Sequence, residues 1–101
     1  MTIEEYEAFV KEGSPFFKFE TITGEHHFVS YIMYAKILTY NNYTAYVEPL
    51  CYLYADYCGH KEFTLCNTSV VSIVISDISR ASECEIKELY KYLKRYGYQS
   101  K

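Results

Sequence analysis

Four side chains in the second half of the chain are of the types that bind zinc: Cys51, Cys58, His60 and Cys66. Structural zinc sites commonly begin from closely spaced cysteine pairs such as Cys-x-x-Cys. No such pair is present, and Cys51 and Cys66 lie in runs typical of strands. Free cysteine is among the most often buried residue types. We therefore predict that these thiols and that of Cys84 are reduced and hold no metal.

Two short stretches combine residues used in acid–base chemistry. Cys58 and His60 are the types of a thiolate nucleophile and its base. Side chains so close in sequence rarely meet productively, and no residue is evident as an oxyanion donor. The Glu-His-His run at 25–27 follows an expected turn. Neighbouring histidines in a strand point to opposite faces, so they do not serve one metal. We predict a protein that is not an enzyme and has no catalytic residue or cofactor.

A basic stripe lies on the segment predicted to form the last helix: Lys87, Lys91, Lys94 and Arg95. Such side chains contact phosphates, so a small barrel that binds nucleic acid is one alternative. A solvated helix face, with cations near the helix C-terminus, is the other interpretation. The net charge of −3 disfavours general affinity for nucleic acid, so we favour the second. The stripe remains a second candidate surface.

A tyrosine-rich stretch separates Ile37 from His60. It holds six of the 13 tyrosines and no lysine or arginine. Stacking of nucleobases on aromatic rings needs a basic groove for the backbone, and this stretch has none. Tyrosine is enriched in protein–protein interfaces. The stretch therefore favours a protein partner, although many of its rings are equally expected to fill the core of a small sheet.

Alternation along this stretch selects the residues expected to face outward. In the strand-like run 43–48, Ala45 and Val47 share one face, and Tyr46 and Glu48 share the more polar one. Two further outward-facing residues, Asp56 and Tyr57, are expected in the Asp-Tyr-Cys-Gly turn that follows. The predicted partner-binding residues are Tyr46, Glu48, Asp56 and Tyr57.

The first element expected to position these residues is a helix over 2–12. Thr2 and Glu5 have the spacing of a capping box, and Gly13 followed by Pro15 predicts the end of the helix. The apolar stripe consists of Ile3, Tyr6, Phe9 and Val10.

Short strands are expected through the middle. The segment 15–29 predicts a hairpin around Gly24, and the run Tyr40–Tyr43 predicts a turn between two strands. Pro49 is expected to end or edge a strand. The runs 50–55, 60–66 and 69–76 predict further strands. Since no crossover helices are available, the strands are expected to be antiparallel.

The last helix is expected over 83–96. Ser82 and Glu85 form a second capping box, and Gly97 marks the end. The apolar side chains fall at helical spacing and are expected to cover one face of the sheet: Ile86, Leu89, Tyr90, Leu93 and Tyr96.

The segment SDISRASECEIKELYKYLKRYGY, residues 76–98, carries a resemblance. It resembles the closing segment of small phage and mobile-element proteins of gut bacteria, which end in an Arg-x-Ala-Thr/Ser-Glu-type cap, an amphipathic helix and Gly-Tyr. The resemblance covers about the last fifth of the chain and transfers no functional residue. It implies an origin in a phage, prophage or conjugative element.

These observations predict one α+β domain over residues 1–101. We expect a strongly bent antiparallel sheet or an SH3-like small barrel of five to six strands, with an N-terminal and a C-terminal helix. The N-terminus is acidic with no long apolar run, and no stretch is apolar enough to span a bilayer. We expect a cytoplasmic protein of a bacterial host.

The first expectation is that the protein is a non-enzymatic protein-binding module. In its more specific form, this module is an inhibitor of a host defence complex and is similar in general character to anti-CRISPR proteins. The alternatives are a nucleic-acid-binding small barrel and a structural protein that pairs with its own copy through an uncovered strand edge.

Overall fold

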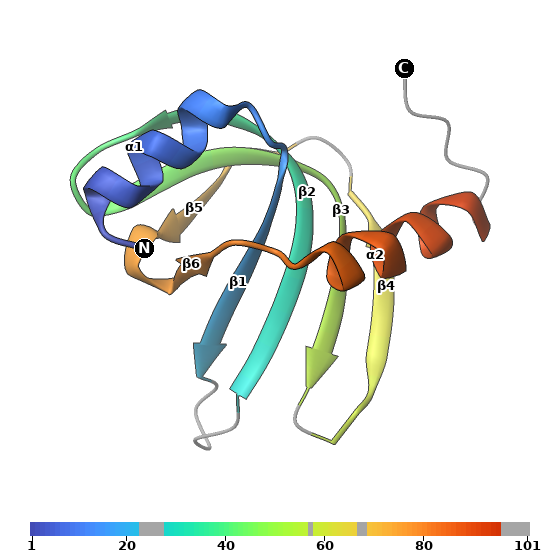
Figure 1. Cartoon of the computed structure of the whole chain (residues 1–101). Helices are drawn as coiled ribbons and strands as arrows, with labels where there is room; N and C mark the ends of the chain where they lie inside the picture. Colours follow the sequence, from blue (N-terminus) through green and yellow to red (C-terminus); the bar gives the residue numbers. More distant parts are fainter. Residues whose placement is uncertain (23–27, 57, 67–68, 96–101) are drawn as a thin grey trace.

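The computed structural model describes residues 1–22, 28–56, 58–66 and 69–95 (Figure 1). Along the chain, one helix precedes the strands and one follows them. In order, the elements are α1 (Ile3–Glu12), β1 (Phe16–Ile22), β2 (Phe28–Tyr40), β3 (Thr44–Asp56), β4 (Lys61–Leu65), β5 (Val71–Val74), the 3-10 helix η1 (Ile75–Asp77), β6 (Ile78–Ser79) and α2 (Glu83–Arg95).

All strand pairs are antiparallel and belong to one sheet of six strands. The order is β4-β3-β2-β1-β6, and β5 pairs with the first half of β3. Among the described residues no pairing joins β6 to β4 or β5, so the sheet is open. The predicted α+β class with an antiparallel sheet and two terminal helices is confirmed. The small-barrel alternative is not confirmed, because the sheet does not close.

A β-bulge divides β3 into two halves. Pro49 lies opposite Ala35, but Cys51 lies opposite Tyr34, so Leu50 is an extra residue on β3. A bulge bends a strand and increases its twist. The first half of β3 and the part of β2 that pairs with it accordingly curl around α1 (Figure 1). Pro49 was expected to end or edge a strand; it does not end one, because β3 continues through it, but on one side of β3 it has no strand opposite it.

Proline is tolerated at this position because β3 changes partners there. Its first half pairs with β5 as far as Val47, and its second half pairs with β4 from Cys51 onward. Pro49 falls between these two partners on that side of β3, the kind of position in a sheet where proline is tolerated.

A second shift of register lies in β2. Ile37 is opposite Val47 and Thr39 is opposite Tyr46, so Leu38 is an extra residue. Leu38 is exposed, whereas Ile37 packs against the core under α1. The second bulge therefore adds to the curl without removing the apolar side chains of β2 from that core.

The helices cover opposite faces of the sheet. We call the face under α1 the inner face and the face under α2 the outer face. The alternation of β1 serves both, because Phe17 is buried on the inner face and Phe16 on the outer face. The inner core consists of Tyr6, Phe9, Phe17, Met33, Ala35, Ala45, Val47, Ile73, Ile75 and Ile78. The outer core consists of Phe16, Ile32, Cys51, Leu53, Leu89 and Leu93.

Both helices begin as the sequence predicts. The Thr2 side chain accepts from the backbone N–H of Glu5, the Glu5 carboxylate accepts from that of Thr2, and Gly13 ends α1 with a φ of 77°. At α2, the Glu85 N–H donates to Ser82 Oγ at 3.1 Å, and the Ser82 N–H donates to Glu85 Oε1 at 2.9 Å. The predicted stop at Gly97 lies outside the described residues.

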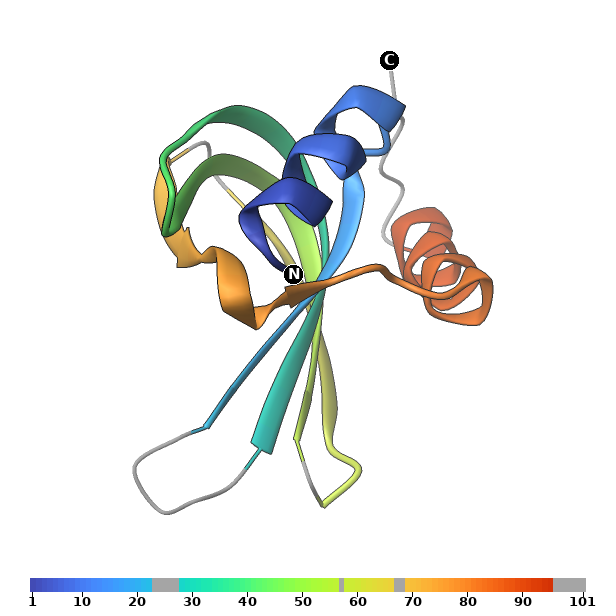
Figure 2. The same cartoon turned by 60° about the vertical axis from the view of Figure 1, so that its left-hand side comes forward.

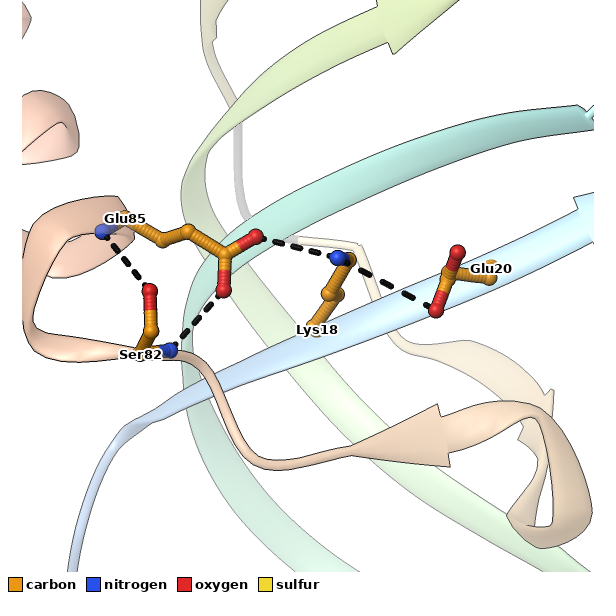
Figure 3. A network of polar contacts seen from close by, with 4 residues as sticks. All are labelled: Lys18, Glu20, Ser82 and Glu85. Carbon is orange, nitrogen blue, oxygen red and sulfur yellow. Dashed lines mark hydrogen bonds and ion pairs between the residues drawn. The ribbon is translucent and has the colours of Figure 1, made fainter.

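A polar network joins the start of α2 to β1 (Figure 3). Lys18 Nζ lies 3.1 Å from Glu85 Oε2 and 4.0 Å from Glu20 Oε1. Partial burial alone would raise the pKa of Glu85. The hydrogen bonds from Ser82 and Lys18, with the charge of Lys18, outweigh it and hold that pKa below its ordinary value of 4.5. Glu85 thus links helix capping to the sheet.

One further strand prediction was wrong. The apolar run 69–76 does not form one strand, because β5 ends at Val74 and η1 turns the chain toward the short β6, which pairs with β1. The loop between β2 and β3 is held by Asn41, whose Oδ1 accepts from the N–H groups of Tyr43 and Thr44 at 2.8 Å each. The hairpin of β1 and β2 is confirmed, while its turn at 23–27 lies outside the described residues.

The Tyr6→Phe variant is expected to be as stable as the parent protein or more stable. Tyr6 is fully buried, burial raises its pKa, and its Oη has no hydrogen-bond partner among the described residues. Removing an unpaired buried hydroxyl is expected to raise the free energy of unfolding by about 1 kcal/mol. Urea unfolding measures the change, with Tyr43→Phe as the control, because the Tyr43 side chain is 79% exposed. A loss above about 1 kcal/mol would show that the hydroxyl is bonded.

Glu85→Ala is expected to lower the free energy of unfolding by about 1 kcal/mol at neutral pH, since it removes a cap and a partly exposed ion pair. The folded-state pKa of Glu85 is lowered, so its contribution is complete above 4.5 and is lost as the pH falls through the folded-state value. Urea titrations across this range should show the deficit shrinking in acid. Glu83→Ala, in the same turn, is the control and should show a smaller change.

Candidate functional site

Four aromatic side chains form an uncovered patch on the inner face. Phe19 on β1 lies opposite Tyr31 on β2, and Tyr31 lies opposite Tyr54 on β3. Tyr52 precedes Tyr54 by one alternation on the same face. All four are half-buried. We call Phe19, Tyr31, Tyr52 and Tyr54 the tyrosine face.

The rings of the tyrosine face support one another. The Tyr31 ring lies 5.3 Å from that of Tyr52 at 74° and 5.4 Å from that of Tyr54 at 60°. The Phe19 ring lies 5.8 Å from that of Tyr31. The two pairs that Tyr31 makes with Tyr52 and Tyr54 are edge-to-face, an arrangement that is favourable and fixes ring orientation. Burial, with a smaller effect of the neighbouring tyrosines, raises the pKa of Tyr31, so its hydroxyl stays neutral at physiological pH.

The tyrosine face is open because α1 covers only the curled part of the sheet. The other ends of β1 to β4 extend past α1, and α2 lies against the opposite face (Figure 2). Neither helix packs over Tyr52 or Tyr54.

Two hollows of about 380 Å³ each share Tyr31 and Tyr52. The first, which we call the apolar hollow, lies between the tyrosine face and β5. Its lining consists of Phe19, Thr21, Tyr31, Met33, Pro49, Tyr52, Cys66, Ser69, Val71, Ser72 and Ile73. The second, the tyrosine pocket, lies toward the β3–β4 turn. Its lining consists of Tyr31, Tyr52, Tyr54, Asp56, His60, Glu62 and Thr64.

The acidic rim of the tyrosine pocket is held by the β3–β4 turn. Asp56 Oδ1 accepts from the N–H groups of Cys58 at 3.0 Å and His60 at 2.9 Å. Glu62 lies opposite Tyr54, and its Oε2 lies 3.8 Å from His60 Nε2. The His60 ring in turn lies 6.5 Å from that of Tyr54. Two carboxylates thus border a pocket walled by three tyrosine rings.

The four predicted partner-binding residues do not lie together. Tyr46 and Glu48 are half-buried and alternate with Ala45 and Val47 of the inner core, so they point away from the inner face. Asp56 lines the tyrosine pocket on that face. Tyr57 lies outside the described residues. The structure therefore separates Tyr46 and Glu48 from Asp56, and their role in binding stays a prediction.

The basic stripe is exposed along α2. Lys87, Lys91, Lys94 and Arg95 all reach solvent, and all but Lys94 border a groove with Cys84, Glu88 and Tyr92. The guanidinium of Arg95 lies 5.5 Å from the centre of the Tyr92 ring. The stripe is on the side of the sheet opposite the tyrosine face, so one small ligand cannot bridge the two.

The four cysteines are free thiols in different environments. Cys51 is buried, Cys66 is half-buried, and Cys58 and Cys84 are exposed. Burial, with a smaller effect of Cys66, raises the pKa of Cys51 to about 12, and burial also raises that of Cys66. In the part of the chain that the structure describes, no three His, Cys, Asp or Glu side chains are placed to share a metal. His26 and His27 lie outside that part.

Of the residues predicted to bind a partner, Asp56 lines the tyrosine pocket. The sequence analysis did not single out the other lining residues Tyr31, Tyr52, Tyr54, His60 and Glu62 as neighbours of one pocket. The spacing of Tyr52 and Tyr54 shows that they share a face, which is a usable signal. Which face they occupy depends on the bulge at Leu50, and the sequence does not reveal it.

Comparison of the chain with protein-family models, with curated proteins and with solved structures gave no match. A membrane-spanning helix is absent from the described residues, where neither α1 nor α2 has the length and apolar character required.

Alkylation in the folded state is expected to modify Cys58 and Cys84 first and to spare Cys51. At pH about 8, a thiol with a pKa of about 12 is thiolate in roughly one molecule in ten thousand, and burial also excludes the reagent. Peptide mass spectrometry after timed iodoacetamide treatment measures each site, and denatured protein is the control. Equal labelling of Cys51 and Cys84 before unfolding would contradict the buried position of Cys51.

Proposed function

We propose that this chain is a non-enzymatic module that binds a protein partner through the tyrosine face. The observation that carries the proposal is a sheet face with four half-buried aromatic rings that neither helix covers. Aromatic side chains joined to an apolar hollow and a polar rim are typical of the centre of a protein interface. Tyrosine is suited to such a position because one ring offers a large apolar surface and a hydroxyl.

The charge of the face favours a protein over nucleic acid. Neither the apolar hollow nor the tyrosine pocket is lined by a lysine or arginine among the described residues, and Asp56 and Glu62 border the pocket. A nucleic-acid strand that stacked its bases here would bring its phosphates toward carboxylates without a basic groove. A partner with a basic surface meets no such repulsion.

The more specific form of the proposal is an inhibitor of a host defence complex, encoded by a phage or mobile element and acting in the cytoplasm of a bacterial host. Its support is the resemblance of residues 76–98 together with the acidic net charge of −3, which suits a partner surface built to hold nucleic acid. Phosphate binding by the basic stripe on α2 is the alternative function, favoured by the cluster of Lys87, Lys91 and Arg95 around one groove.

Affinity capture from a bacterial host tests the proposal by comparing variants. The tagged Tyr52→Ser/Tyr54→Ser variant is expected to lose proteins enriched by the parent chain by roughly tenfold or more, since interface aromatics are each worth about 2 kcal/mol. Tyr43→Ser/Tyr90→Ser is the matched control, because both rings are exposed, at 79% and 42%, and lie outside the tyrosine face. Quantitative mass spectrometry measures enrichment, and thermal unfolding confirms that each variant is folded.

Three outcomes of this experiment would overturn the proposal. Enrichment that is equal in the two double variants would place binding elsewhere. Loss of binding only in Lys91→Glu/Arg95→Glu, with a steep salt dependence and retained nucleic acid, would assign function to the basic stripe. Recovery of a second copy of the chain alone would indicate a homo-oligomeric accessory protein.

A further inference from the structure

We propose that the tyrosine pocket binds the guanidinium group of an arginine side chain presented by the partner protein. This inference rests on the proposed protein-binding function and names the chemistry of the partner at one position. A cation that leaves water needs other interactions to replace its hydration. The pocket offers two kinds, which are aromatic rings and carboxylate charge.

The three rings are arranged as walls. Tyr31 stands between Tyr52 and Tyr54 and is tilted by 74° and 60° to them, so the pocket presents rings in different planes. A cation within about 6 Å of a ring centre is attracted by its negative face, and several rings around one cation add their attraction. The tyrosines are held by two neighbouring strands, β2 and β3, so their positions are set before a ligand arrives.

The carboxylates lie where a cation between the rings would reach them. Asp56 uses Oδ1 for the turn amides of Cys58 and His60, which leaves Oδ2 without a donor among the described residues. Glu62 lies directly across from Tyr54. His60 is the only side chain among the described lining residues that can carry a positive charge, and its Nε2 lies 3.8 Å from Glu62 Oε2.

Two lysines on the strands of the sheet, Lys18 and Lys61, pair with carboxylates on the outer face. Lys61 pairs with Glu88 of α2, and Lys18 lies 3.1 Å from Glu85. No lysine or arginine of the described chain therefore neutralises Asp56 and Glu62 within the pocket. Their charge is therefore open to a cation that a partner presents.

Arginine fits better than lysine for two reasons. Its planar guanidinium stacks on a ring while its N–H groups point outward in the ring plane, toward carboxylates at the pocket edge. It is also less strongly hydrated than an ammonium group, so less hydration is lost on entry. The adjoining apolar hollow, which shares Tyr31 and Tyr52, would receive an apolar side chain next to that arginine.

The test uses two short peptides that differ only in charge: acetyl-Gly-Arg-Gly-amide and the same peptide with citrulline. Ring resonances of Tyr31, Tyr52 and Tyr54 are followed by NMR at pH about 8. The arginine peptide is expected to shift them saturably, and citrulline is expected to bind roughly fivefold more weakly or worse. A lysine peptide is expected to fall between the two.

Variants separate the carboxylate from the rings. Glu62→Gln is expected to weaken arginine binding roughly threefold, and Glu83→Gln, on the exposed start of α2, is the matched control with no change. Tyr54→Leu is expected to weaken it roughly threefold as well, with Tyr43→Leu as its control. Equal binding of arginine and citrulline, no effect of Glu62→Gln, or tighter binding of lysine would each overturn the proposal. So would shifts of the same resonances by single-stranded oligothymidylate without any by arginine.

The two proposals fail separately. If capture of a protein depends on Tyr52 and Tyr54 but arginine gives no saturable shift, the arginine pocket is wrong while the protein-binding function stands. If arginine binds as expected but no captured protein depends on the tyrosine face, the protein-binding function is wrong while the pocket stands.

Discussion

Leu50 is an extra residue on β3 with no partner opposite it on β2. The arrangement of side chains on the inner face follows from this bulge. Before it, odd-numbered residues such as Ala45 and Val47 enter the core under α1. After it, odd-numbered residues such as Cys51 and Leu53 enter the core under α2. Without the change of phase, Tyr52 and Tyr54 would point toward α2. The same bulge bends the sheet, which creates the apolar hollow between its two parts.

The open tyrosine face has a structural cause and an energetic one. Helix α1 has only ten residues, and its buried side chains are used by the curled part of the sheet. The remaining part of the inner face must tolerate water, and tyrosine does so because its hydroxyl stays hydrated while its ring packs on neighbouring rings. The cross-strand ring pairs stabilise the sheet itself. Stability and the proposed recognition would therefore depend on the same side chains.

Charge is divided between the two faces. The outer face carries the Lys18–Glu85 and Lys61–Glu88 pairs and the basic stripe of α2. The inner face carries Asp56 and Glu62 with no described lysine or arginine in either hollow. The net charge of −3 conceals this division. A small protein with faces of opposite sign orients itself toward a charged partner, so the acidic face would lead toward a basic surface.

The sequence by itself determined the parts of this protein that depend on local interactions. The capping boxes at Thr2 and Ser82, the stop at Gly13 and the hairpin of β1 and β2 involve residues close in the chain, and each was predicted from spacing alone. The spacing of Tyr52 and Tyr54 places both on one face of a strand, although this pair was not predicted as a site. Tertiary structure decided which face, because the register of β3 against β2, β4 and β5 is set by side chains far apart in the chain packing under α1 and α2. For the same reason the sequence placed Tyr46 and Glu48 with Asp56, whereas the bulge at Leu50 puts them on opposite sides of the sheet. A period of two predicts alternation within a strand, but one extra residue reverses it, and the energy that favours the extra residue comes from the packed cores.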